Sequence, residues 1–136
     1  MKTVLGFIVT MMLSLSALAV NYKTQADAVA DLHRYSAADA KKGDEHIADM
    51  VVKVDAAVQF AVSHKAPSPL LAEIVRVSAI AIKNDPSNAV ADVLVPLYKK
   101  YPKDVQEAVK ALPKSEGDLL MKAVKDSARE QDSGNG

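Results

Sequence analysis

The sequence contains no cysteine and no tryptophan, and its 136 residues include only four tyrosines and two phenylalanines. Without cysteine, the chain can form no disulfide and offers no thiol as a nucleophile or metal ligand. The five glycines are scattered, so no glycine-rich loop for phosphate binding is present. The apolar residues are mainly alanine, valine, leucine and isoleucine, a composition typical of closely packed helices. The fold must therefore be stabilised by its aliphatic core.

The chain also lacks an excess of either charge, with 17 basic and 17 acidic side chains. Non-specific nucleic-acid binding requires a basic surface that displaces counterions, so we expect no nucleic-acid partner. A length of 136 residues is sufficient for one domain but not for two.

The N-terminus has the three features of a secretory signal peptide. Lys2 supplies the positive charge, Val4 to Leu18 form an uncharged apolar run, and Ala17-Leu18-Ala19 is a small-x-small cleavage site. We expect cleavage after Ala19 and a mature chain that starts at Val20; the alternative is an uncleaved N-terminal anchor. The protein is therefore expected to be exported, with the periplasm preferred and secretion to the medium as the alternative.

The stretch from Leu70 to Ile82 is apolar except for Glu73, Arg76 and Ser78. A helix that is apolar on nearly all sides is normally buried by several neighbours, and this one is too short to span a bilayer. We predict an all-α fold: a compact bundle of five or six helices around a central helix at about 69–83. The domains expected are the signal peptide at 1–19, the helical domain at 20–130 and a disordered tail at 131–136.

Turn residues divide the rest of the mature chain. Gly43, Pro69, Pro86, Pro102 and Pro113 stand between segments that have apolar residues at helical spacing. No stretch alternates with a period of two, so no sheet is expected. The other helices are predicted at about 24–41, 44–65, 86–101, 102–112 and 115–130. Within the fourth of the six helices, Pro96 is expected to produce a kink rather than a break.

The helix at 44–65 carries two apolar faces. The main face consists of Ile47, Met50, Val51, Val54, Val58 and Ala61, at spacings of three and four. A second face consists of Val52, Ala56 and Phe60. The sequence leaves open whether this second face is core or a contact surface for a partner.

The densest group of basic and aromatic residues runs from Tyr98 to Lys103. Tyr98, Lys99, Lys100 and Lys103 suit contact with an acidic partner or a membrane surface. Alternatively, the lysines keep a helix end soluble and interact favourably with its dipole. With Val52 and Phe60, these four residues form the predicted partner-binding set.

Glu73 and Arg76 are three residues apart on the most apolar helix and are predicted to form an ion pair. The pair is either a narrow solvent-facing stripe or a device that fixes how the bundle, or a partner, docks.

The sequence offers little that could carry chemistry. Asp39, Asp44, Glu45, His46 and Asp49 cluster around one helix–helix turn, but a single histidine among carboxylates is a poor zinc site, and acidic residues favour helix N-termini without a metal. No Gly-x-Ser-x-Gly or Ser-x-x-Lys motif is present. We therefore expect no metal, no cofactor and no enzymatic activity.

These features favour an exported, non-enzymatic protein-interaction module, acting on a protein partner as an inhibitor or adaptor. The alternatives are a carrier or sensor of a small apolar ligand held between helices, and a helical protein in weak contact with a membrane surface. Both a monomer and a dimer are compatible with the sequence.

Overall fold

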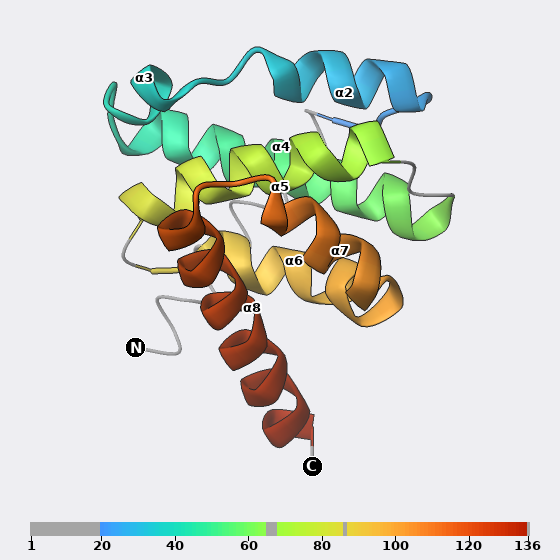
Figure 1. Ribbon diagram of the computed structural model, residues 1–136. Coiled ribbons are helices and arrows are strands. Elements are labelled where there is room, and N and C mark those ends of the chain that lie inside the picture. The colour runs from blue at the N-terminus through green and yellow to red at the C-terminus, as the bar shows by residue number, and fades with distance from the viewer. Residues whose placement is uncertain (1–19, 65–67, 86, 136) are drawn as a thin grey trace.

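The structure is a computed structural model that describes residues 20–64, 68–85 and 87–135 (Figure 1). Within these ranges the chain forms seven helices and no strand, which confirms the all-helical class and exceeds the expected five or six helices by one. The helices are α2 (Gln25–His33), α3 (Ala37–Ala40), α4 (Asp44–Ser63), α5 (Ser68–Asn84), α6 (Ala89–Lys100), α7 (Pro102–Lys110) and α8 (Lys114–Asn135). The predicted signal peptide at 1–19 lies outside the described residues and stays a prediction.

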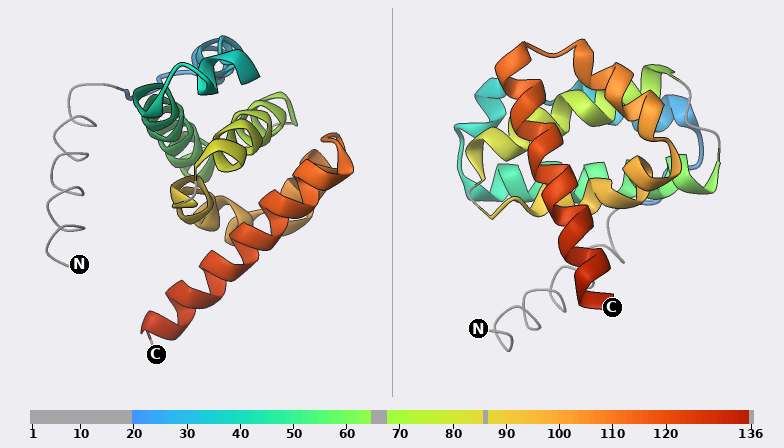
Figure 2. Two further views of the ribbon diagram at one scale, coloured as in Figure 1. Left: turned by 90° about the vertical axis from the view of Figure 1, so that its left-hand side faces the viewer. Right: turned by 60° about the horizontal axis from the view of Figure 1, so that its bottom comes forward.

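The helices are stacked in layers. Figure 2 shows α2 and α3 on one side of α4 and α5, with α8 on the opposite side, and the end of α8 projects beyond the rest of the bundle. Helix α5 contacts each of the other six described helices. A central helix must make such contacts. That the rest of the bundle is organised around α5 stays a prediction. Within the described residues, no helix is both long enough and apolar enough to cross a bilayer.

The buried face of α4 follows the predicted spacing. The six residues assigned to its main apolar face are all buried, together with Ala57. On α5, the hydroxyl of Ser78 is also buried and donates to the backbone carbonyl of Ile74 over 2.6 Å. No buried side-chain nitrogen or oxygen of the described residues lacks a hydrogen-bond partner.

The single helix predicted at 24–41 is wrong, because the chain breaks between α2 and α3. Thr24 caps α2 as expected, accepting a hydrogen bond from the amide of Asp27 at 3.1 Å. At the break, Tyr35 is buried and Ser36 opens α3 in a reciprocal capping box with Asp39. Arg76 of α5 donates hydrogen bonds to the carbonyl oxygens of Leu32 and Tyr35. A residue from another helix therefore supplies the donors that the C-terminal end of α2 lacks.

The predicted start of α6 at Pro86 is also wrong, since the helix begins at Ala89. The carboxylate of Asp85 accepts hydrogen bonds from the amide of Ser87 at 2.9 Å and from its hydroxyl at 2.7 Å. Asn88, with φ of 57°, then precedes the helix in the left-handed region. Asp85 therefore stabilises a turn instead of capping the helix; Pro86 itself lies outside the described residues.

Two other prolines lie within or next to helices. Helix α6 continues through Pro96, so this residue does not break the helix, and the kink expected there stays a prediction. Pro102 is the first residue of α7, as expected. The last helix is longer than predicted: α8 reaches Asn135, although an end near Glu130 and a disordered tail were expected. Asp132 in this extension forms an ion pair with Lys99 of α6 at 2.6 Å, which attaches the extension to the bundle.

Candidate functional site

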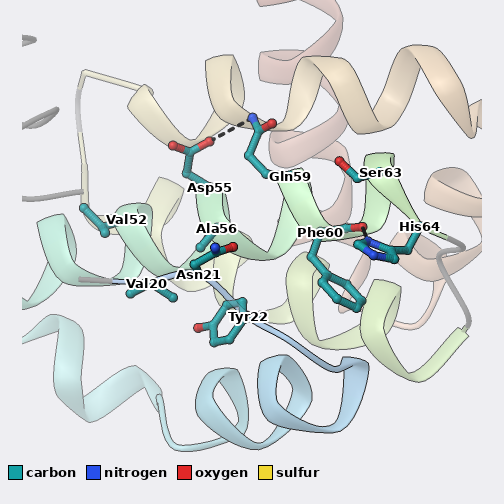
Figure 3. Close-up of a pocket in the computed structure, with 10 residues that line it drawn as sticks. All are labelled: Val20, Asn21, Tyr22, Val52, Asp55, Ala56, Gln59, Phe60, Ser63 and His64. Atoms are coloured by element: carbon teal, nitrogen blue, oxygen red, sulfur yellow. Dashed lines mark hydrogen bonds between the residues drawn. The ribbon is translucent and has the colours of Figure 1, made fainter. Parts of the chain in front are cut away.

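The segment Val20–Tyr22 and α4 together form a groove that is open to solvent and has a volume of about 300 Å³ (Figure 3). We call it the α4 groove. Its lining combines apolar, aromatic and polar side chains, which are Val20, Asn21, Tyr22, Val52, Asp55, Ala56, Gln59, Phe60, Ser63 and His64. All but the first three come from α4 or from its C-cap, His64.

The second apolar face of α4 forms the floor of this groove. Val52, Ala56 and Phe60 are all half-buried, because the short segment Val20–Tyr22 covers this side of α4 in place of a helix. The structure therefore places two of the predicted partner-binding residues, Val52 and Phe60, in one groove. The second apolar face of α4 is therefore neither fully buried core nor fully exposed surface.

The segment Val20–Tyr22 is held in place by Tyr22. Its hydroxyl donates a hydrogen bond to Asp31 of α2 at 2.5 Å. Asp31 also forms ion pairs with Lys53 of α4 at 3.3 Å and with Arg34 at 2.5 Å. Burial of the Tyr22 ring and its bond to Asp31 raise the pKa of the Tyr22 hydroxyl. Burial alone would raise the pKa of Asp31, but the bonds from Tyr22 and Lys53 together lower it. The carboxylate thus stays charged and holds one wall of the groove against both α2 and α4.

One end of the groove is formed by two stacked rings. Phe60 and His64 lie with ring centroids 4.3 Å apart and an angle of 15° between their planes. Nδ1 of His64 is 3.1 Å from the carbonyl oxygen of Phe60, which can only accept, so Nδ1 carries the proton of that bond. Nε2 is left as the acceptor of the neutral ring. This end of the groove therefore presents a flat apolar surface beside a hydrogen-bonding group.

The basic segment of α6 meets α4 close to that end. Lys100 donates to the carbonyl of Val62, and the hydroxyl of Tyr101 donates to the carbonyl of His64 at 3.4 Å. The ammonium group of Lys100 also lies 5.5 Å from the ring centroid of Tyr101. These contacts satisfy carbonyls at the end of α4.

The other predicted contact residues of this segment lie in different surroundings. Tyr98 is half-buried against the core, Lys99 is paired with Asp132 of α8, and Lys103 is exposed on α7. The structure therefore places Val52 and Phe60 in one groove, and Tyr98, Lys99, Lys100 and Lys103 are not among the residues that line it.

The predicted pair of Glu73 and Arg76 forms, with 2.8 Å between Arg76 Nε and Glu73 Oε2. Arg76 also donates to the carbonyl oxygens of Tyr35 at 2.7 Å and Leu32 at 2.9 Å, and Glu73 contacts Nδ1 of His33 at 2.9 Å. Burial alone would raise the pKa of Glu73, but the bonds from His33 and Arg76 lower it. We call this group the α5 clamp, because it holds the end of α2 on α5.

The acidic cluster around the α3–α4 turn is engaged in local bonds. Asp39 accepts from Ser36 at 2.7 Å and from Lys42 at 3.0 Å; the bonds from Lys42 and Ser36 lower its pKa to about 2. Asp49 accepts a short hydrogen bond from the hydroxyl of Tyr35. Across the described residues, no group of three or more histidines and carboxylates could hold a metal ion.

Sequence reasoning missed seven of the residues that line the groove, which are Val20, Asn21, Tyr22, Asp55, Gln59, Ser63 and His64. The polar residues at 55 and 59 lie beside the apolar positions 52, 56 and 60 on α4, so helical spacing could have identified them. The role of Tyr22 could not be predicted from spacing, because it depends on how the segment Val20–Tyr22 lies over α4.

Comparison with known proteins found no matching family model, and no curated protein and no solved structure with significant similarity.

Proposed function

We propose that the protein is an exported, non-enzymatic interaction module that binds a protein partner through the α4 groove and the adjoining end of α4. The observation that carries this proposal is the incomplete cover of α4. Its face of Val52, Ala56 and Phe60 is left half-buried beneath a three-residue segment, and the gap is open to solvent. A partner side chain inserted there would complete the burial of this face.

The composition of the groove favours a protein over a small apolar cargo. Asp55, Gln59 and Ser63 line its border, and a wholly apolar ligand would offer these side chains no hydrogen-bond partner. Protein contact sites combine an aromatic centre with a polar rim. Phe60 supplies the centre, and these polar residues supply the rim.

Export is part of the same proposal. Cleavage after Ala19 would make Val20 the first residue of the mature chain, and Val20 lines the groove. Processing would then leave a new N-terminus at the edge of the contact site. Mass analysis of the protein recovered from an exporting host tests this step: a retained Met1 contradicts it.

Site-specific photo-crosslinking in cells that naturally export the chain tests the binding site. A photoreactive residue at Gln59, which is exposed in the groove, is expected to yield one adduct of defined mass. The matched control is Asn84, an exposed amide residue at the end of α5. No adduct at Gln59, or equal adducts at both positions, contradicts the proposal.

Two substitutions then separate binding from folding. Phe60→Ala removes the aromatic centre and is expected to abolish the Gln59 adduct. Gln59→Arg, in a chain crosslinked from Ser63, adds bulk and charge at an exposed position without removing core contacts. Both variants should retain the helical circular dichroism of the native chain, and an adduct that survives both changes would place the partner elsewhere.

A further inference from the structure

A second groove lies between α7 and α8 and shares no lining residue with the α4 groove. Its volume is about 470 Å³. The residues that line it are Gln106, Val109, Lys110, Leu112, Lys114, Gly117, Asp118, Met121 and Lys125. We call it the α7–α8 groove. Nothing in the proposed interaction site uses these residues.

The floor of the α7–α8 groove is apolar. Val109 is 7% exposed, and Leu112 and Met121 are half-buried against the core. Gly117 allows the two helices to come close, because a Cβ there would lie 3.0 Å from Cγ1 and 3.2 Å from the carbonyl oxygen of Val109. Met121 is unbranched and flexible, so it can adapt its shape to an apolar chain.

The rim of this groove is basic. Three lysines and one aspartate line it, although the chain as a whole has no net charge. Lys110 pairs with Glu107 at 2.9 Å and Lys114 with Asp118 at 3.0 Å, but all four side chains are mostly exposed. Such pairs are screened by water and exchange easily for another anion. Lys125 has no carboxylate within ion-pair distance among the described residues.

We propose that the α7–α8 groove binds a monomeric anionic amphiphile, with the apolar chain on Val109, Leu112 and Met121 and a carboxylate headgroup at the lysines. The volume lies within the range of roughly 300–1,000 Å³ that is usual for small-molecule sites. Charge complementarity selects an anionic headgroup over a neutral or cationic one.

Calorimetric titration of the exported protein with sodium dodecanoate, below its micelle concentration, tests the proposal. We expect one molecule bound per chain, and dodecyltrimethylammonium, which has the same chain length and the opposite charge, should bind at least about tenfold more weakly. Lys125→Glu should weaken dodecanoate binding by about tenfold. Lys41→Glu is the matched control, because Lys41 is also exposed, forms no ion pair among the described residues and lies outside the groove.

Three results would overturn the proposal. These are the absence of binding to monomeric dodecanoate, equal affinity for the two amphiphiles, or equal weakening by the two lysine substitutions. Binding only to vesicles of anionic phospholipid would also overturn it, because that result indicates attraction to a charged bilayer surface instead of a groove. Met121→Gln provides a second check, since it keeps the rim charge and should still weaken binding through the apolar floor.

Discussion

The two halves of the bundle are held together in different ways. In the first half, from α2 to α5, polar side chains bond to segments far away in the sequence: Arg76 reaches carbonyls 41 and 44 residues away, and His33 meets Glu73 across 40. In the second half, from α6 to α8, most ion pairs join residues three or four apart on one exposed helix, as between Arg129 and Asp126. Lys99 with Asp132 is an exception.

Helix length accounts for the long-range bonds at α2 and α3, although α7 in the second half also has nine residues. Helices α2 and α3 have nine and four residues, which is too short for stability in isolation, so their ends need partners from other segments. Helices α6 and α8 have 12 and 22 residues and bury continuous apolar faces, so their surface pairs are less important for the fold. A polar contact therefore matters most for stability where the helix that it holds is too short to be stable alone.

The sharpest test removes an arginine from each half. Arg76→Leu should lower the free energy of unfolding by about 2–3 kcal/mol, because it leaves Glu73 without its cation and two carbonyls without their donor. Arg129→Leu should leave stability unchanged within experimental error, since its partner Asp126 is at the surface. Urea unfolding followed by circular dichroism measures both, and equal losses would remove the distinction between the halves.

A smaller effect is expected from a pair of tyrosines. Tyr35→Phe removes the hydroxyl that donates to Asp49 and should cost about 1 kcal/mol. Tyr98→Phe, in the second half, should cost nothing measurable, because no hydrogen bond of the Tyr98 hydroxyl is found among the described residues. The same unfolding measurement applies, and a loss at Tyr98 as large as that at Tyr35 would contradict the expectation.

Acid should affect the first half through the α5 clamp. The pKa of Glu73 is lowered from its ordinary value of 4.5, so its charge stabilises the fold above about pH 4.5, and this contribution is lost as the pH falls through the lowered pKa. Glu73→Gln should therefore reduce stability at neutral pH and flatten its decline in acid. Asp126→Asn, measured in about 0.5 M salt to screen surface charges, should leave the decline as steep as in the native chain.

Local signals in the sequence were sufficient to predict much of the second half and the body of α4. The buried face of α4 and the start of α7 at Pro102 were predicted correctly because spacing and proline geometry act within a few residues. The break after α2 was missed, although Ser36 and Asp39 have the spacing of a capping box. Its other cause, Arg76, lies on α5 and could not be found from the local pattern.

The candidate site follows the same division. Val52 and Phe60 were selected from helical spacing, and both line the α4 groove. The opposite wall is formed by an irregular segment, Val20–Tyr22, whose position depends on the bond from Tyr22 to Asp31. Irregular backbone has no periodicity to analyse, so a groove with one such wall was not predictable from sequence patterns.

The bond between Tyr22 and Asp31 also bears on the lifetime of the protein. An aminopeptidase must draw the chain end out in extended form before it can remove a residue. In a chain that begins at Val20, as predicted, only Val20 and Asn21 precede Tyr22, which is half-buried and bonded to α2. Degradation from such an end should therefore pause before Tyr22, and complete turnover would have to wait for the release of Tyr22 from α2.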